Sequence, residues 1–506
     1  MTSTKQIYIL HIFCIILTGC TSSNSEEIIS SIEVGNSILT LSKVADNLDV
    51  PWDLQYDPLN NVIIFSEIAG KIKKLDLRTN EVTSIAHLED VYQLRTLGLL
   101  GMALYQPNKG QHYLYLSYTS KTDKNIYSNL VRYDFKEDKL SNPKTLLQIP
   151  GNTGHNGSRI IISKDNKILW ATGDAAHDNY AQDTTSLNGK ILRLNPDGSI
   201  PNDNPIANSY VYAWGFRNIQ GLTQSASGSI YTSEHGDAIE DEVNLIHPLH
   251  NYGWPQIEGM HDTDKEMAIA KISARTEPIH SWTPVIAPSG MAYYNSTAIP
   301  TWKNSLLLVT LKTQSMRILK LSDDGTTIVD ENVLFTDYLG RLRSVLVLPN
   351  GDIYFSSSNR DWNPQKGFPK KKDDAIYRIT KSNHVQGPVI RPKTVRKEIA
   401  LSGKTLYEAY CSSCHKTDGA GIAHLFPSLR QSPIVLGDDN DLASLLLYGT
   451  ADKKEKSPYE GKMPAFNFLT DEEIELIANY IRTSFGNTGS KISPQTIQSN
   501  RRQNAK

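Results

Sequence analysis

The chain has 506 residues, a length that suits roughly two or three domains, and 39% of them are hydrophobic, enough to build a large core. The 52 basic and 54 acidic residues give a formal net charge of −2, and no strongly basic block interrupts the sequence. This balance excludes the electrostatic footprint of a nucleic-acid-binding protein. We therefore expect a globular protein with no nucleic-acid partner.

Residues 1–19 have the features of a lipoprotein export signal. Lys5 precedes an apolar run at 7–17, and this run ends in "LTGC" at 17–20. The run is too short to span a bilayer, and "LTGC" resembles a bacterial lipobox. The prediction is that Cys20 is lipidated and anchors the protein in the bacterial cell envelope, facing the periplasm or the outer surface. An ordinary signal peptide with a chance cysteine is the alternative, and it also implies export.

The chain has four cysteines, and none of them is left over for a structural disulfide. Cys14 and Cys20 lie in the export signal, and Cys411 and Cys414 lie in the motif "CSSCH" at 411–415. Stability must therefore come from burial and from bound cofactors or ions.

After a predicted tether at 20–40, residues 41–380 repeat one β unit. A turn signal is followed by a strand of alternating apolar residues and then by a second short strand. The first strands are expected at 60–67, 111–118, 166–173, 228–234, 304–310 and 351–357, and their partners at 71–77, 130–135, 190–195, 242–246, 316–321 and 375–380. Six copies of such a unit predict an all-β six-bladed propeller. A β-sandwich or a solenoid is the alternative.

The remaining residues change character. Residues 381–398 are polar and basic with two prolines in "HVQGPVIRPKTVRK", which indicates an interdomain linker. Residues 399–486 have helical periodicity and predict a small all-α domain, whose last helix begins at Thr470 or Asp471 as N-cap. The polar residues 487–506 are predicted to be a disordered tail.

The motif "CSSCH" is typical of covalent haem attachment. Cys411 and Cys414 can form thioethers with the porphyrin vinyl groups, and His415 supplies an axial nitrogen to iron. A zinc site would need a second Cys/His pair, which is missing after the export signal. A thioredoxin-type dithiol would need a preceding strand, whereas "TLYEAY" is helical in character.

Met463, in "GKMPAF", is the predicted sixth ligand of the haem iron. It is the only methionine after the motif, and Pro464 stiffens its loop. A thioether ligand would raise the reduction potential, as suits an electron acceptor. His424 is the alternative ligand. With "GKMPAF" and the last helix, residues 400–486 resemble small soluble cytochrome c domains.

In the β domain, His155 and Asp174 are the candidates for acid–base chemistry. His155 lies in a Gly-rich loop before one predicted strand, and Asp174 follows the next. A carboxylate fixes the tautomer of a histidine and raises its proton affinity, as a general base requires. A loop histidine that merely closes a turn is the alternative.

Four cations at loop–strand junctions of different blades predict an anion site. They are Arg217, which is followed by Asn218, and Lys312, Arg341 and Arg343. Such a set suits a small polyanion at the propeller axis, although solvated edge charges are the usual fate of these residues. Because Arg341 and Arg343 alternate, both should lie on one face of their strand.

Several motifs together resemble one family. They are "GLLGMAL" (98–104), "GHNGSRI" (154–160), "GFRNIQGL" (215–222), "SEHGD", "DEVNLI" and "NYGWP" (between 233 and 255), "APSGMAYY" (287–294) and "GRLRSVLVLPNGDIY" (340–354). In this order they are similar to the soluble aldose dehydrogenases that use pyrroloquinoline quinone (PQQ), also called the glucose/sorbosone dehydrogenases.

The resemblance implies a role for each matching residue. His155 would be the base and Asp174 its partner, while Arg217, Asn218, Lys312, Arg341 and Arg343 would bind PQQ. The backbone carbonyls of Gly236 and Asp237 would hold a calcium ion against the cofactor, and Trp282 would line the sugar site. A tricarboxylate needs cations, and calcium favours oxygen ligands.

The same resemblance implies a reaction. His155 would take the proton of an aldose anomeric hydroxyl while hydride passes to the quinone, giving a lactone. Electrons would then pass to the haem and on to an external acceptor, a soluble cytochrome or a terminal oxidase. The chain departs from the family where Arg95, Thr96 and Leu97 stand near a frequent Gln and where Asp237 replaces a frequent proline, so cofactor affinity and sugar preference are open.

Two other functions compete with this one. A catalytically silent propeller that binds a carbohydrate or a partner would leave the cytochrome as the only redox element. A larger quinoprotein alcohol dehydrogenase would resemble an eight-bladed propeller with adjacent cysteines, whereas this chain has six units and no Cys-Cys pair.

Overall fold

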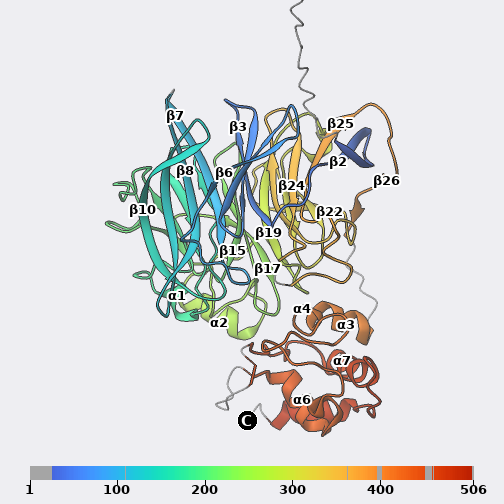
Figure 1. Cartoon of the computed structure of the whole chain (residues 1–506). Coiled ribbons are helices and arrows are strands. Elements are labelled where there is room, and N and C mark those ends of the chain that lie inside the picture. The colour runs from blue at the N-terminus through green and yellow to red at the C-terminus, as the bar shows by residue number, and fades with distance from the viewer. Residues whose placement is uncertain are drawn as a thin grey trace, which may run out of the picture.

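The computed structural model describes residues 26–108, 110–361, 363–395, 402–450, 458–459 and 461–503. A large β domain is followed by a small helical domain that lies against one end of it (Figure 1). The predicted lipidation site, Cys20, lies outside the described residues. Among the helices of the described segments, none is both long enough and apolar enough to cross a membrane.

The β domain is a ring of six sheets (Figure 1). Five of them are β3 (Pro51–Asp57), β4 (Val62–Glu67), β5 (Lys71–Asp76) and β6 (Val82–His87); β7 (Leu99–Asn108), β8 (Gln111–Thr122), β9 (Asn125–Lys136) and β10 (Lys139–Gly151); β11 (Ile160–Ile162), β12 (Ile168–Ala171), β13 (Lys190–Leu194) and β14 (Val211–Trp214); β15 (Ile219–Gln224), β16 (Ile230–Glu234), β17 (Asp241–Ile246) and β18 (His280–Trp282); and β19 (Pro288–Tyr294), β20 (Ser305–Thr310), β21 (Met316–Leu321) and β22 (Ile328–Leu334). The sixth contains β23 (Leu342–Val347), β24 (Ile353–Ser357) and β25 (Ile376–Ser382). The predicted six-bladed propeller is confirmed, which excludes the eight-bladed architecture.

The twelve strands predicted from the repeat correspond to the middle two strands of each blade. The first strand of each blade contacts the first strand of its neighbour, as β3 does with β7 and β19 with β23, so these strands surround the axis. The described connections of the propeller contain three short helices, namely α1 (Asp178–Gln182), α2 (Asp264–Ile272) and the 3₁₀ turn η1 (Pro300–Trp302).

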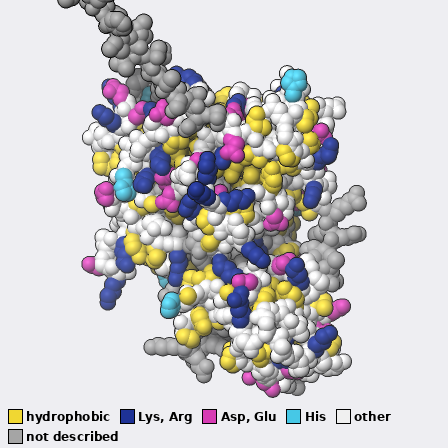
Figure 2. All heavy atoms as spheres, turned by 45° about the vertical axis from the view of Figure 1, so that its right-hand side comes forward, with side chains coloured by type: hydrophobic (Ala, Val, Ile, Leu, Met, Phe, Trp, Pro, Cys, Tyr) yellow, Lys and Arg dark blue, Asp and Glu magenta, His cyan; other side chains and the backbone are white. Residues whose placement is uncertain are grey.

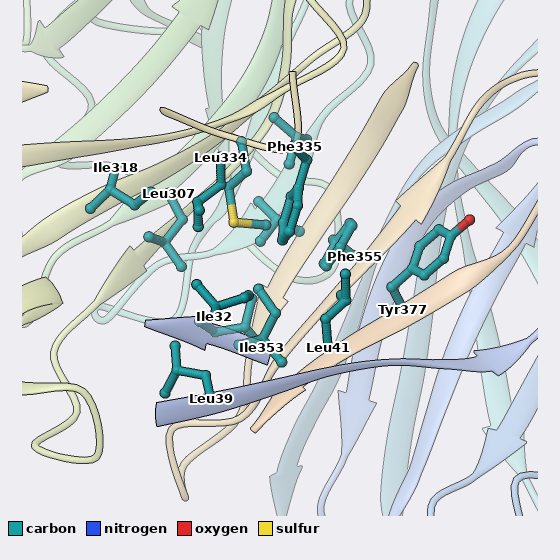
Figure 3. Close-up of a cluster of buried hydrophobic side chains, with 14 of the residues drawn as sticks. Ile32, Leu39, Leu41, Leu307, Ile318, Leu334, Phe335, Ile353, Phe355 and Tyr377 are labelled. Carbon is teal, nitrogen blue, oxygen red and sulfur yellow. The ribbon is translucent and has the colours of Figure 1, made fainter. Parts of the chain in front are cut away.

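The N-terminal strands close the ring, which corrects the predicted tether at 20–40. β1 (Glu27–Val34) and β2 (Ser37–Ala45) form a hairpin, and β2 pairs with β25 so that the chain's beginning completes the last blade. Ile32, Leu39 and Leu41 are fully buried and pack near Phe355 and Tyr377 (Figure 3). Without this closure the outer edge of β25 would stay unpaired, and the last blade would lack the strand that joins the two ends of the ring.

The predicted linker at 381–398 is also partly built into the propeller. β26 (Val389–Ile390) pairs in parallel with β1, and β27 (Lys393–Thr394) pairs with β22 of another blade. These outer strands offer unpaired backbone groups, which an extended polar segment can satisfy. The described part of this connection therefore runs along the rim of the propeller.

The small domain is helical, as predicted. Its helices are α3 (Gly403–Tyr410), α4 (Ser412–His415), α5 (Pro433–Leu436), α6 (Asp439–Tyr448), α7 (Asp471–Thr483) and α8 (Pro494–Gln503). Thr470 is the N-cap of α7, and it forms a capping box with Glu473. The buried faces of α3, α6 and α7 share one core with Cys411.

The polar tail predicted at 487–506 is instead part of this domain as far as residue 503. Ile497 on α8 is fully buried, Ile492 is nearly so, and both belong to the domain core. The Arg501 guanidinium pairs with Asp471 at 2.8 Å at the start of α7. Two isolated isoleucines in a polar sequence give little periodic signal, and their burial depends on the distant helices α6 and α7.

The substitution Ile497→Ala should lower the unfolding free energy of the helical domain by about 3 kcal/mol, because it leaves a cavity in a buried contact. Calorimetric unfolding of the full chain measures this, with the exposed neighbour Gln498→Ala as the control. Equal stability of the two variants would contradict the packing of α8 into the core.

Candidate functional site

A cavity of about 610 Å³ lies at the end of the propeller that faces the helical domain. Its wall includes most of the predicted site residues, namely His155, Arg217, Asn218, Gly236, Asp237, Lys312, Arg341 and Arg343. These residues come from different blades, and the folding of the ring brings them together. Arg95 and Thr96, at the position of the first departure from the family, also line the cavity.

His155 and Asp174 form the hydrogen-bonded pair that the sequence predicts. The Nδ1 atom of His155 lies 2.9 Å from Oδ1 of Asp174, whose carboxylate is completely buried. The same carboxylate accepts hydrogen bonds from the indole N–H of Trp254 and the backbone N–H of Ala176, both at 2.8 Å. Three donors therefore fix this carboxylate, and it in turn fixes the imidazole.

Backbone packing sets the position of this pair. His155 has a left-handed φ of 52°, and its carbonyl oxygen would lie 2.1 Å from a Cβ atom at Gly173. Only glycine allows the His155 loop to approach the end of β12 so closely. The backbone N–H of Asp174 donates to the carbonyl of Arg217 at 2.8 Å, which connects the pair to the next blade.

The environment of His155 lowers its pKa and so favours the neutral form. Burial is the largest cause of the lowered pKa, and the nearby Arg217 guanidinium lowers the pKa further. The Asp174 carboxylate raises it, but by less. Because the carboxylate accepts at Nδ1, the proton of the neutral ring lies there and Nε2 retains a lone pair. His155 thus presents an acceptor to the cavity, as a general base must.

Arg341 and Arg343 lie on the same face of their strand, as the alternation predicts. Both guanidinium groups donate to one oxygen of Asp361, which is fully buried; the Arg341 contact is 3.1 Å and the Arg343 contact is shorter. Burial lowers the pKa of Arg343 to about 10. Sequence reasoning missed Asp361, which orients both arginines.

Arg217 has one donor that the described protein does not satisfy. Its Nη2 atom lies 2.7 Å from Oδ1 of Asp237, and its Cζ atom lies 5.3 Å from the centre of the Trp254 ring. Its Nε atom is buried and has no hydrogen-bond partner among the described residues. A buried donor without a partner is costly, so Arg217 is suited to receive an anionic ligand.

The turn at Gly236 and Asp237 is held by buried carboxylates. One carboxylate oxygen of Asp241 accepts a hydrogen bond from the Gly236 backbone N–H at 3.0 Å. Its other oxygen accepts from the backbone N–H groups of Ile286 and Ala287. Burial raises the pKa of Asp241 to about 6. Within the described residues no group of three or more His, Cys, Asp or Glu side chains could hold a metal ion, so a cation at this turn would rely on backbone carbonyls and on a ligand.

Taken together, the charged side chains of the described cavity wall are out of balance. Six of them are cations and three are acids, which leaves an excess of three positive charges. The cations are Arg95, Arg217, Lys312, Arg341, Arg343 and Lys462, and the acids are Asp237, Asp241 and Asp361. Lys462 is exposed, whereas the other five cations are buried or partly buried, and such cations require compensation. The cavity therefore suits a polyanion.

Trp282 does not line this cavity, contrary to the prediction. It is buried on β18, where its indole N–H contacts the Glu331 carboxylate at 3.2 Å and the Arg317 guanidinium lies over its ring. β18 is the outermost strand of its blade, and three strands of the same sheet separate it from the propeller axis. The tryptophans near the site are instead Trp52, in the cavity wall, and Trp254, which contacts Asp174.

The haem motif has the geometry that axial ligation requires. Cys411 and Cys414 are not joined in a disulfide, and one helical turn brings His415 beside Cys411, whose carbonyl accepts from its N–H at 3.0 Å. The Nδ1 atom of His415 is 2.9 Å from the Pro427 carbonyl, which leaves Nε2 for iron. Cys414 also lines the cavity beside the propeller residues.

Of the two candidates for the sixth ligand, Met463 is better placed. It packs against the core that contains Cys411, and its backbone N–H and carbonyl both bond Thr450, at 2.8 and 2.9 Å. His424 is exposed. The structure thus favours Met463 as the axial ligand.

Comparison with known proteins agrees with this geometry. The family model for Glucose / Sorbosone dehydrogenase matches residues 48–363, and the model for Cytochrome c matches residues 400–485. Quinoprotein glucose dehydrogenase B of Acinetobacter calcoaceticus is 29% identical over 411 residues, covering 64% of this chain and 86% of that protein.

Two further relatives cover the two domains separately. The PQQ-bound structure of aldose sugar dehydrogenase from Streptomyces coelicolor is 30% identical with a TM-score of 0.59, covering 68% of this chain and 98% of that one. The cytochrome c subunit of alcohol dehydrogenase (quinone) from Gluconobacter oxydans is 33% identical over 101 residues, 19% of this chain and 21% of that protein. The chain therefore belongs to the glucose/sorbosone dehydrogenase family and carries a C-terminal cytochrome c domain.

Proposed function

We propose that the protein is a PQQ-dependent aldose dehydrogenase that passes electrons to its own haem. It oxidises the anomeric carbon of an aldose to a lactone, and an external acceptor takes the electrons from the haem. The observation that carries this proposal is that one cavity wall contains His155, Cys414 of the haem motif and an excess of three positive charges.

The residues present fit PQQ. The three carboxylates of this cofactor match the charge excess, and the buried Nε of Arg217 is a donor that a carboxylate can satisfy. Arg341 and Arg343 are held by Asp361, and they present a fixed pair of guanidinium groups. Lys312 and Asn218 complete the set on the other blades.

The backbone carbonyls of Gly236 and Asp237 would hold calcium, a hard ion that takes oxygen ligands. The Asp237 side chain, in place of a proline, is already paired with Arg217. It adds a carboxylate beside the proposed ion, where the proline that is frequent in the family has none.

The residues of this chain supply proton transfer and orientation. Bound PQQ would supply the hydride acceptor for the substrate carbon. Nε2 of His155 takes the proton of the anomeric hydroxyl, and Asp174 stabilises the imidazolium that forms. Trp254 and Ala176 hold the Asp174 carboxylate in place throughout.

In the cytochrome domain, Cys411 and Cys414 would attach the haem covalently, with His415 and Met463 as axial ligands. An outside soluble cytochrome or a terminal oxidase would reoxidise the haem. The oxidation of each aldose releases two electrons, and the haem held by these residues would supply a one-electron acceptor.

Anaerobic haem spectroscopy tests the function. Glucose should reduce the haem of the purified protein only when both PQQ and calcium have been added, and His155→Ala should lower the rate by about a thousandfold, because it removes a general base. Haem that stays oxidised with every aldose, although PQQ is bound, would place the substrate outside simple sugars. Failure to bind PQQ would leave a non-catalytic carbohydrate- or partner-binding propeller as the better description.

The pH dependence tests the His155–Asp174 pair. His155 acts only when neutral, so glucose oxidation should fall as the pH drops below its lowered pKa. Asp174→Asn removes a carboxylate that favours the imidazolium, so the acid limb should move to lower pH. The maximal rate should fall by about a hundredfold, because the tautomer is no longer held.

Trp254→Phe is the matched control for Asp174→Asn. It removes one donor to the carboxylate but keeps the charge beside His155, so a smaller loss of rate is expected. An acid limb that does not move in Asp174→Asn would contradict the assigned pair. Steady-state glucose oxidation with a small-molecule acceptor, measured over a range of pH, provides both quantities.

The proposed location is the bacterial cell envelope, with a lipid on Cys20. Because β1 begins at Glu27, only residues 21–26 would separate the lipid from the propeller. Cys20→Ser should move the expressed protein from the membrane fraction to the soluble fraction while its glucose oxidation is kept. Membrane retention of this variant would contradict the lipid anchor.

A further inference from the structure

The wall of the catalytic cavity comes from both domains. Leu425, Phe426, Gly461 and Lys462 of the cytochrome domain line it together with His155. The helical domain therefore covers the open end of the propeller, and in Figure 2 it sits directly against the larger domain, with Lys and Arg side chains near the junction.

Two lysines hold the haem motif at this junction. The Lys312 ammonium of the propeller donates to the carbonyl of Ala409, in the last turn of α3, where a cation also favours the helix dipole. From the other side, the Lys416 ammonium donates to the side-chain oxygen of Asn363 in the cavity wall. These contacts bracket the segment from Cys411 to His415.

Apolar packing accompanies these polar contacts. Ala238, which follows the Gly236–Asp237 turn of the propeller, packs against the core of the cytochrome domain. Phe426 lies close to Gly461, so that these two cytochrome segments form one continuous piece of the cavity wall. The same propeller turn thus faces the cavity on one side and the haem domain on the other.

The charges at the junction favour an anion in the cavity. Lys416 lies near enough to the Arg341 guanidinium to be repelled by it, and Lys462 adds a further positive charge to the cavity wall. Lys312 has three donors, of which one serves Ala409, and the others remain for a carboxylate. An anion in the cavity would offset the repulsion between the domains, so its binding and the docking of the cytochrome should favour each other.

We propose that the docked cytochrome domain is the lid of the cavity and its direct electron outlet, held by Lys312 and Lys416 and favoured by the polyanionic cofactor. This inference rests on the proposed function. The two electrons taken from an aldose would leave the cavity one at a time on the side where Cys414 lies, and a haem held there would accept each as it goes from ferric to ferrous. A one-electron acceptor outside the protein reoxidises the haem after each transfer, and the substrate protons pass to water.

The test uses the full-length protein loaded with haem, PQQ and calcium, mixed anaerobically with glucose in a stopped-flow instrument. Lys416→Glu should slow haem reduction by about tenfold or more, because the loss of the hydrogen bond to Asn363, whose oxygen would then face a carboxylate, outweighs the relief of the repulsion from Arg341. Lys416→Arg should stay within about twofold of the parent, because it keeps the charge and the donor. Lys491→Glu, at an exposed lysine between α7 and α8, is the matched control and should change nothing.

Two additional measurements separate docking from other effects. Asn363→Ala removes the same contact from the propeller side and leaves the haem domain intact, so it should also slow haem reduction, even if Lys416→Glu failed to incorporate haem. The midpoint potential of the haem should be the same in parent and Lys416→Glu, which excludes a change at the adjacent His415 as the cause.

Glucose oxidation with a small-molecule acceptor that takes electrons from the cofactor should persist in Lys416→Glu. If that activity is missing in the parent protein, the proposed function fails. If the activity is present and Lys416→Glu and Asn363→Ala both reduce haem at the parent rate, the docking proposal is wrong.

Discussion

The excess of three positive charges in the catalytic cavity is the constraint on which the rest of the structure depends. Buried cations are costly unless they are paired, and Asp237, Asp241 and Asp361 lie beside Arg217, Lys312 and the pair of Arg341 and Arg343. The unsatisfied Nε of Arg217 shows where that pairing is incomplete. A polyanionic cofactor therefore completes the site electrostatically as well as chemically, and it would also offset the repulsion between the two domains.

The closed ring makes this arrangement possible. Cations from separate blades keep fixed separations because β2 pairs with β25 and joins the beginning of the propeller to its end. The glycine at 173 then allows the His155 loop to reach Asp174. The cytochrome domain covers the same end of the ring, so His155, the cluster of cations and the haem motif meet at one cavity although they are distant in sequence.

Local patterns in the sequence predicted the features of the fold and of the site that depend on neighbouring residues. The alternation of Arg341 and Arg343, the capping of α7 and the middle strands of the six blades are confirmed. Features that depend on distant contacts were missed. Residues 27–40 pair with the last blade, α8 packs on helices far along the chain, and Asp361 follows no strand pattern. Trp282 was misplaced because a motif does not tell whether its strand lies at the axis or at the rim.

The measurement that tests the central claim most directly is the dependence of haem reduction on protein concentration. Protein loaded with PQQ and calcium is mixed with saturating glucose without oxygen, over about a hundredfold range of protein concentration. If the cavity feeds the haem of the same chain, the first-order rate constant for haem reduction stays unchanged across that range. A rate constant that rises in proportion to protein concentration would show that electrons pass between molecules, and it would contradict the cavity shared by the two domains.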